Sequence, residues 1–205
     1  MVSRPPDAPG PIELHALARC HRLCLPDTAS SRAGLDVLEA LYAGLFADSA
    51  AHVIWEPGPE AAREQGAFAS GTVHYRDTEL LTRRALPAVA FARLAVRALT
   101  MPRHVLARRR WEPLIPQQGI GYVLTLGVAR ALVPSARTRG GRELLAQLEA
   151  WFLSRGCSAS FVDTELSNRR AHDFYLRQGY FELSRDYGQV LLHKPLNAAR
   201  TAEQR

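Results

Sequence analysis

The spacing of apolar residues predicts two helices at the start of the chain. Apolar positions recur with a helical period over residues 12–25, and Pro26 ends the segment. A turn is expected at 27–34, and Ser30 or Ser31 is the expected cap of the next helix. The apolar stripe of that second helix is formed by Leu35, Leu38, Leu41, Tyr42, Leu45 and Phe46.

Two short strands and then a helical segment are expected next. Apolar, β-branched and aromatic residues at 51–57 and 66–75 indicate strands on either side of a turn-rich connection. Residues 75–118 are rich in Ala, Leu, Val and Arg, with breaks at Pro87 and Pro102, and this predicts two or three short helices. The segment is either a helical insertion that packs on the core or a wall of a substrate or acyl pocket.

The C-terminal half alternates between strand and helix patterns. The predicted strands and helices lie, in chain order, at 121–129 (strand), 142–156 (helix), 158–165 (strand), 167–178 (helix) and 188–196 (strand). Gly156 and Gly179 are the expected ends of the two helices. Such alternation within one segment predicts an α/β fold.

Length and composition favour one globular domain. The chain has 205 residues, of which 47% are hydrophobic and 22% charged. Residues 1–10 and 198–205 are expected to be loose ends around a domain at 11–197, which includes the helical segment at 75–118. Neither a run of ~20 apolar residues nor a signal-peptide pattern is present, so we expect a cytoplasmic protein without a membrane partner.

Charge and cysteine usage exclude some further classes. The net charge of +6 suits a polyanionic partner, but no nucleic-acid module is recognisable, and no nucleic-acid partner is expected. The three cysteines favour free thiols. Cys20 and Cys24 lie near His15 and His21, a spacing that could hold a metal. Because no second ligand cluster follows, we expect buried thiols and no metal.

The connection after the strand at 121–129 has the composition of an anion site. It contains two adjacent glycines and three arginines, namely Gly140, Gly141, Arg137, Arg139 and Arg142. Glycines let backbone N–H groups approach a phosphate, a helix N-terminus adds a positive dipole, and arginines add charged hydrogen bonds. The alternative is an ordinary glycine-bearing loop with solvated arginines.

A second group of polar residues spans the next strand and helix. Four residues are expected on one helix face, namely Asn168, Ala171, His172 and Tyr175. Asp163 and Glu165 share one face of the preceding strand. An amide and a phenol thus lie beside a strand end that carries carboxylates. The structural alternatives are an N-cap at Asn168 and a half-buried aromatic at Tyr175.

The same segment resembles a known family. Asn168, Ala171, Phe174, Tyr175, Gly179 and Tyr180 match every position of the N-x-x-A-x-x-F-Y-x-x-x-G-[FY] pattern of the GNAT superfamily of N-acetyltransferases. The likeness covers roughly 121–196. It implies a mixed, mostly antiparallel central sheet flanked by helices, with the insertion at 75–118 before the central cofactor-binding strand. It also implies acyl transfer from acetyl-CoA, or another acyl-CoA, to a primary amine by direct attack in a ternary complex.

The resemblance also implies roles for single residues. The backbone of Leu126, Gly127 and Val128 would bind the pantetheine arm. The pyrophosphate would be held by Arg137, Thr138, Arg139, Gly140, Gly141 and Arg142. Asn168 would contact the cofactor, and Tyr175 would protonate the departing thiolate.

Asp163 takes the place where ribosomal-protein alanine acetyltransferases carry a glutamate base. A base is needed because an amine attacks a thioester only in its neutral form. A carboxylate with an ordinary pKa of about 4 is a weak base, so Asp163 would need burial or an intervening water. Glu165 and His172 are the reserve candidates.

Two departures from the family pattern leave alternatives open. Arg142 stands at the last position of the loop motif [QR]-x-x-G-x-[GA], where the family has a small residue, and the first family strand is not recognisable near the N-terminus. A non-catalytic acyl-CoA-binding or partner-binding module is therefore the alternative to an enzyme. The apolar segment 85–99 also suggests a longer acyl donor. The acceptor is expected to be a small-molecule or peptide amine, and the analogy allows a homodimer.

Overall fold

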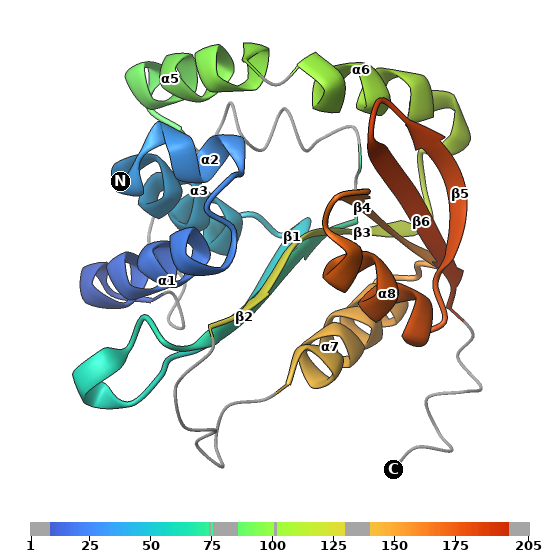
Figure 1. Ribbon diagram of the computed structural model, residues 1–205. Coiled ribbons are helices and arrows are strands. Elements are labelled where there is room, and N and C mark those ends of the chain that lie inside the picture. Colours follow the sequence, from blue (N-terminus) through green and yellow to red (C-terminus); the bar gives the residue numbers. More distant parts are fainter. Residues whose placement is uncertain (1–8, 74, 76–85, 101, 130–139, 197–205) are drawn as a thin grey trace.

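The computed structural model describes residues 9–73, 75, 86–100, 102–129 and 140–196 (Figure 1). The helices of the N-terminal half are α1 (Pro11–Cys24), α2 (Ala29–Ala33), α3 (Leu35–Ala47), η1 (Glu60–Ala62), α5 (Ala88–Leu99), α6 (Pro102–Trp111) and η2 (Glu112–Leu114). Those of the C-terminal half are α7 (Gly141–Ser154) and α8 (Arg169–Arg177). Among the described residues, none of these helices combines the length and apolar character needed to span a bilayer.

A six-stranded sheet forms the centre of the molecule. Its strands, in chain order, are β1 (Ala51–Glu56), β2 (Ala67–Thr72), β3 (Ile120–Val128), β4 (Ala159–Glu165), β5 (Phe181–Asp186) and β6 (Gln189–Pro195). Their spatial order is β1-β2-β3-β4-β6-β5. Neighbours β3 and β4 run parallel, and the other four pairs are antiparallel. The predicted mixed, mostly antiparallel sheet is confirmed.

Helices cover both faces of this sheet (Figure 1). On one face, α7 and α8 pack through an apolar cluster that includes Leu148, Phe152 and Tyr175. On the other face, α1 and α3 cover β1 to β3, and α6 covers β3, β4 and β6. Helix α5 extends this second layer by packing against α2 and α3. We call the first the α7–α8 face and the second the α1–α6 face.

Most elements lie where the apolar pattern places them. The predicted ends of α7 and α8 are confirmed, because Gly156 and Gly179 have φ values of 79° and 85°, which glycine adopts without strain. The segment 75–118 contains α5, α6 and η2, as its composition indicates. Strand β5 is not among the predicted strands. Its apolar residues Phe181 and Leu183 are exposed, and the polar residues Glu182, Ser184 and Asp186 lie on the less exposed side, which is the reverse of the usual strand pattern.

The N-terminal turn also differs from the prediction. The expected cap at Ser30 or Ser31 is wrong, since Thr28 caps α2 by accepting a hydrogen bond from the Ser31 backbone N–H at 3.3 Å. Helix α2 occupies part of the predicted turn at 27–34. Of the residues before α1 only Pro9 and Gly10 are described, so the prediction of a short or missing first family strand falls on residues 1–8, outside the described part.

Candidate active site

The two parallel strands at the centre of the sheet, β3 and β4, separate halfway along their length. Their pairing runs from Ile120 opposite Ala159 to Val123 opposite Val162. Beyond that point β4 stays paired with β6, and β3 stays paired with β2. We call the resulting opening, between 124–128 of β3 and 163–165 of β4, the splay. Leu126, Gly127 and Val128, the predicted pantetheine residues, lie along it.

A β-bulge marks the point at which the splay begins. Ser70 pairs with Thr125 and Gly71 pairs with Val123, so Leu124 is an extra residue on β3. The bulge directs two successive side chains to the α1–α6 face. Leu124 packs against the clusters under α1, α3 and α6, and the Thr125 hydroxyl lies 2.6 Å from the Ser70 hydroxyl. The sequence carries a local signal for this bulge in Gly71, a glycine inside a strand pattern, which stands where the register shifts.

The N-terminus of α7 lies next to the splay. Gly140 is the N-cap, with φ −70° and ψ 159°, and a Cβ added at Gly141 would lie 3.3 Å from Leu126. Arg142 is exposed in the first turn of the helix. The predicted pyrophosphate residues Arg137, Thr138 and Arg139 lie outside the described residues. The described part therefore offers a helix N-terminus with an open glycine beside β3.

Tyr175 lies on the α7–α8 face. It is 6% exposed and packs edge-to-face with Tyr180, with 5.5 Å between the ring centroids. Burial, and to a smaller extent the charge of Asp163, raises the pKa of Tyr175 well above its ordinary value. The phenol thus keeps its proton at neutral pH. Asn168 caps the same helix by accepting a hydrogen bond from the Ala171 N–H at 3.1 Å, so the predicted N-cap is confirmed.

Asp163 lies on the α1–α6 face of β4, and its side chain is 7% exposed. It accepts a hydrogen bond from the Tyr122 hydroxyl of β3. An Nη atom of Arg108, from α6, lies 3.6 Å from the same carboxylate. Burial alone would lower the pKa of Arg108, but Asp163 and the nearby tyrosines raise it, and the net effect is a raised pKa. The carboxylate is therefore buried, as the base hypothesis requires, and held in a charged network.

The reserve candidates have other surroundings. His172 is 15% exposed, and its Nε2 lies 2.7 Å from a carboxylate oxygen of Glu182 on β5. Glu165 is exposed at the end of β4 and accepts a hydrogen bond from the Ser167 hydroxyl at 3.0 Å. Of the predicted catalytic groups, Asp163 is near enough to contribute to the raised pKa of Tyr175, although the two lie on opposite faces of the sheet.

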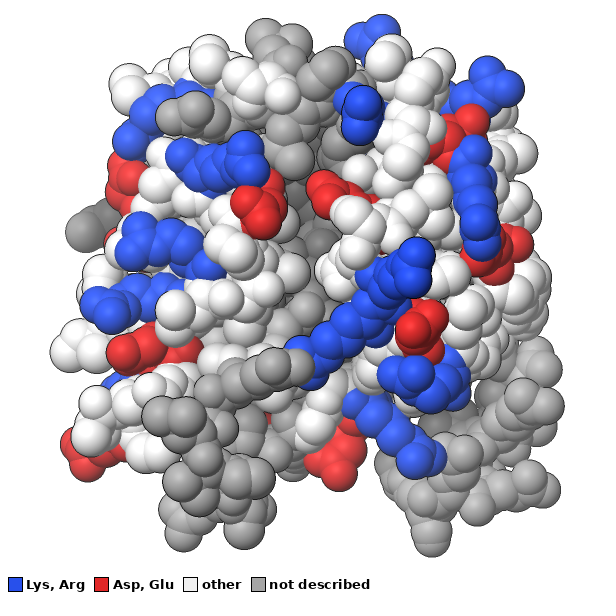
Figure 2. Space-filling model, in the orientation of Figure 1, with Lys and Arg blue, Asp and Glu red and all other residues white. Residues whose placement is uncertain are grey.

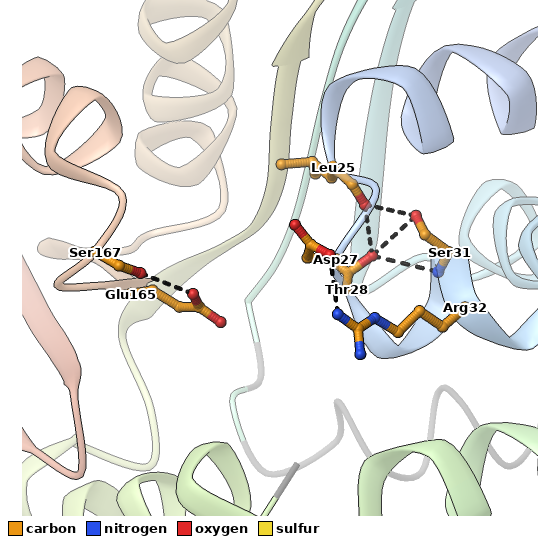
Figure 3. Close-up of polar contacts among 7 residues, drawn as sticks. All are labelled: Leu25, Asp27, Thr28, Ser31, Arg32, Glu165 and Ser167. Atoms are coloured by element: carbon orange, nitrogen blue, oxygen red, sulfur yellow. Dashed lines mark hydrogen bonds and ion pairs between the residues drawn. The ribbon is translucent and has the colours of Figure 1, made fainter. Parts of the chain in front are cut away.

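A hollow opens on the surface beside these groups. Figure 2 shows it between the side of the molecule formed by α1 and α2 and the side formed by α8, with acidic side chains on both sides. In Figure 3, Glu165 and Ser167 face the segment 25–32 across an opening. Asp27 of this segment is paired with Arg32 at 2.9 Å. Segment 25–32 thus forms one wall of the opening and the end of β4 forms the other.

Sequence reasoning missed several residues of the site. Tyr122 and Arg108 hold Asp163, and Thr125 lies at the bulge. Each comes from an element distant in sequence from the motif at 168–180. In the described parts of the chain, no three His, Cys, Asp or Glu side chains gather in a way that could hold a metal ion.

Known proteins share this architecture. The model of the acetyltransferase (GNAT) family matches residues 104–180, from α6 to the residue before β5. No curated protein matches the sequence.

Solved structures match over nearly the whole chain. Aminoglycoside 6'-acetyltransferase type Ii is 14% identical, with 93% of this chain and 94% of that chain covered and a TM-score of 0.57. The ribosomal-protein alanine N-acetyltransferase from Escherichia coli is 11% identical, with 93% of this chain and 92% of that chain covered and a TM-score of 0.53. The PaiA N-acetyltransferase from Thermoplasma acidophilum, solved with coenzyme A, is 10% identical, with 92% of this chain and 96% of that chain covered and a TM-score of 0.51. At such identities the likeness concerns the fold.

Proposed function

Because the chain belongs to the acetyltransferase (GNAT) family, we propose that it transfers an acetyl group from acetyl-CoA to a primary amine by direct attack in a ternary complex. The observation that carries this proposal is the splay, which has a buried, protonated phenol on one face and a buried carboxylate on the other. A donor lying in the splay would be reached by both groups.

The donor would be bound mainly by backbone. Beyond Val123, the edge of β3 that faces the splay is not paired with β4 in the described structure, so its N–H and C=O groups can bond the pantetheine amides. The N-terminus of α7, with Gly140 at its cap, would receive the pyrophosphate. Coenzyme A supplies the thioester, which is the activated acyl group.

In the transfer itself, the neutral amine nitrogen attacks the thioester carbonyl carbon. The C–N bond forms, the C–S bond breaks, and the leaving thiolate takes a proton from Tyr175. The nitrogen gives up its extra proton to Asp163, directly or through a water, and solvent restores both groups. The products are the amide and coenzyme A, with no covalent enzyme intermediate.

The surroundings of Asp163 reduce its strength as a base. Arg108 and the Tyr122 hydroxyl both stabilise the carboxylate, which makes it a weaker proton acceptor. The positive charge of Arg108 also disfavours a protonated amine beside Asp163, so the amine is expected to arrive neutral. The acceptor would enter from the α1–α6 face, between segment 25–32 and Glu165.

A thiol-release screen tests the proposal. Acetyl-CoA and longer acyl-CoAs are each offered with a panel of small-molecule and peptide amines, while calorimetry measures acyl-CoA binding. Amine-dependent release with acetyl-CoA supports the proposal. Binding without release for any amine favours a non-catalytic module, a preference for long donors favours the longer-acyl alternative, and no binding overturns all three.

A further inference from the structure

A second polar network reaches the splay on the α1–α6 face. It starts at the bulge, where Ser70 and Thr125 share a hydrogen bond of 2.6 Å. The Thr125 hydroxyl lies 3.4 Å from the Tyr42 hydroxyl, and the Tyr42 hydroxyl lies 2.7 Å from Nδ1 of His21. Without the bulge at Leu124, Thr125 would face the other side of the sheet. The bulge is thus what connects the donor strand to α1 and α3.

The other ring nitrogen of His21 reaches segment 25–32. Its Nε2 lies 3.3 Å from the Thr28 hydroxyl, which donates in turn to the carbonyl of Leu25 at 3.1 Å or to the Ser31 hydroxyl at 3.0 Å. Ser31 also donates to the Leu25 carbonyl at 2.7 Å. The network therefore runs from β3 to the wall of the opening, and Figure 3 shows its last part, the contacts among Leu25, Thr28 and Ser31.

The protonation state of His21 determines in which direction the hydrogen bonds of this network are donated. His21 is fully buried, and burial lowers its pKa to about 4, so the ring is neutral at physiological pH. A neutral imidazole has one donor and one acceptor. When Thr28 donates to Leu25 or Ser31, Nε2–H donates to Thr28, and Nδ1 then accepts from Tyr42. Stacking on Phe68, with 5.5 Å between centroids, fixes the plane of the ring.

We propose that His21 is a positioning residue for the acceptor: it holds segment 25–32 at a fixed distance from the strand that binds the donor. This inference rests on the proposed function. Only the second half of segment 25–32 is helical, since α2 begins at Ala29 and has five residues. Its side chains nevertheless face Glu165 across the opening. Thr125 lies at the start of the splay. A link from segment 25–32 to Thr125 therefore fixes the position of this wall relative to the thioester carbonyl of the donor.

Two substitutions separate the arms of the link. In His21→Asn the side-chain amide reaches the position of Nδ1 and keeps the bond with Tyr42, but nothing reaches Thr28. In His21→Gln the longer amide reaches the position of Nε2 and keeps the loop arm. We expect His21→Asn to raise the KM for the acceptor about tenfold, with the affinity for acetyl-CoA within a factor of two of the wild type. His21→Gln is expected to recover most of the loss.

Further variants keep the test decisive if His21→Asn folds poorly. Thr28→Val cuts the loop arm from a half-buried position and leaves the core intact, so the same split between acceptor and donor is expected. Because Thr28 also caps α2, Thr28→Ser, which keeps the hydroxyl, is its control and should behave like the wild type. His52→Asn is the matched control, because His52 is stacked on Trp151 of α7 on the other face of the sheet. Hydrogen exchange of amides 25–33 should quicken in His21→Asn and Thr28→Val and stay unchanged in His52→Asn.

Each outcome decides the matter. Faster exchange together with a raised acceptor KM supports the inference. Unchanged exchange overturns it, as does an equal loss of acceptor and donor affinity, which would indicate general destabilisation. Absence of thiol release from the wild-type protein would overturn the proposed function and this inference with it, and that result is visible before any variant is made.

Discussion

The two faces of the central sheet present different chemistry to the splay. On the α7–α8 face, the side chains near it are apolar or aromatic, and Tyr175 is held among Phe174, Tyr180 and the core. On the α1–α6 face, two polar networks approach it. One joins Asp163 to Tyr122 and Arg108, and the other joins Thr125 to Tyr42 and His21.

This difference separates the tasks of an acyl transfer. A dry, aromatic face keeps a phenol protonated beside a leaving group, because burial penalises the phenolate. A face with hydrogen-bonded networks can orient a polar acceptor and carry its proton away. In the proposed mechanism the donor is therefore handled from one face of the sheet and the acceptor from the other.

The largest effect is expected from Tyr175→Phe. Removal of the proton donor should lower kcat by about 100-fold or more, while the Kd for coenzyme A stays within about twofold. Tyr180→Phe is the matched control, since Tyr180 is a buried phenol of the same face whose hydroxyl bonds Ser160 at 2.7 Å. It should lose stability but keep its turnover. Equal turnover in the two variants would remove Tyr175 from the mechanism.

Asp163→Asn tests the other face. Loss of the proton acceptor should lower kcat by about 30-fold at neutral pH, and the Tm should fall because Arg108 loses its charged partner. Asp36→Asn breaks a carboxylate–arginine pair with Arg93 at the surface and serves as the control. If Asp163→Asn loses stability but no turnover, the carboxylate is structural, and the acceptor face has no base at this position.

The buried His21 makes the α1–α6 face sensitive to acid. Its pKa in the folded state is about 4, below the ordinary value near 6.5, so the unfolded chain binds the proton more tightly. The stability contributed by neutral His21 is complete above about pH 6.5 and is lost as the pH falls toward 4. Between pH 7.5 and pH 5 the wild type should lose about 2 kcal/mol more than His21→Asn. Urea unfolding at both pH values measures the difference, and equal losses would contradict it.

The two faces also differ in how well the sequence predicts them. Tyr175 and the cap at Asn168 lie within eight residues, so helical periodicity alone places them on one element. Asp163 follows from the alternation of a short strand. Both predictions depend only on the spacing of residues that are close in the sequence, so they can be made without knowledge of the fold.

The polar networks of the α1–α6 face depend on contacts between distant segments. Tyr122 and Asp163 are 41 residues apart, and Tyr42 and Thr125 are 83 apart. The bulge that turns Thr125 toward Tyr42 comes from a shift in pairing between β2 and β3. Gly71 stands at this shift, but a glycine in β2 does not tell which residue of β3 is the extra one. A local motif therefore predicts the proposed donor half, whereas the proposed acceptor half requires the assembled sheet.

The smallest expected effect concerns the phosphate end of the donor. A Cβ at Gly140 would meet no protein atom within 4 Å, and its φ of −70° suits alanine, so Gly140→Ala should fold, at a cost of about 1 kcal/mol for the poorer N-cap. If phosphate approaches this backbone closely, the added methyl group should weaken coenzyme A binding about tenfold.

Gly10→Ala provides the control for this loop, because Gly10 caps α1 with nearly the same dihedral angles, φ −69° and ψ 170°. Both variants lose the same cap residue, but only Gly140 lies at the proposed phosphate site. Calorimetry with coenzyme A and with its dephosphorylated pantetheine fragment separates the two ends of the donor. Weaker binding of coenzyme A by Gly140→Ala, with unchanged binding of the fragment, places the phosphate at α7. Unchanged binding of both would move the phosphate away from this helix and leave β3 as the part of the donor site still supported by the described structure.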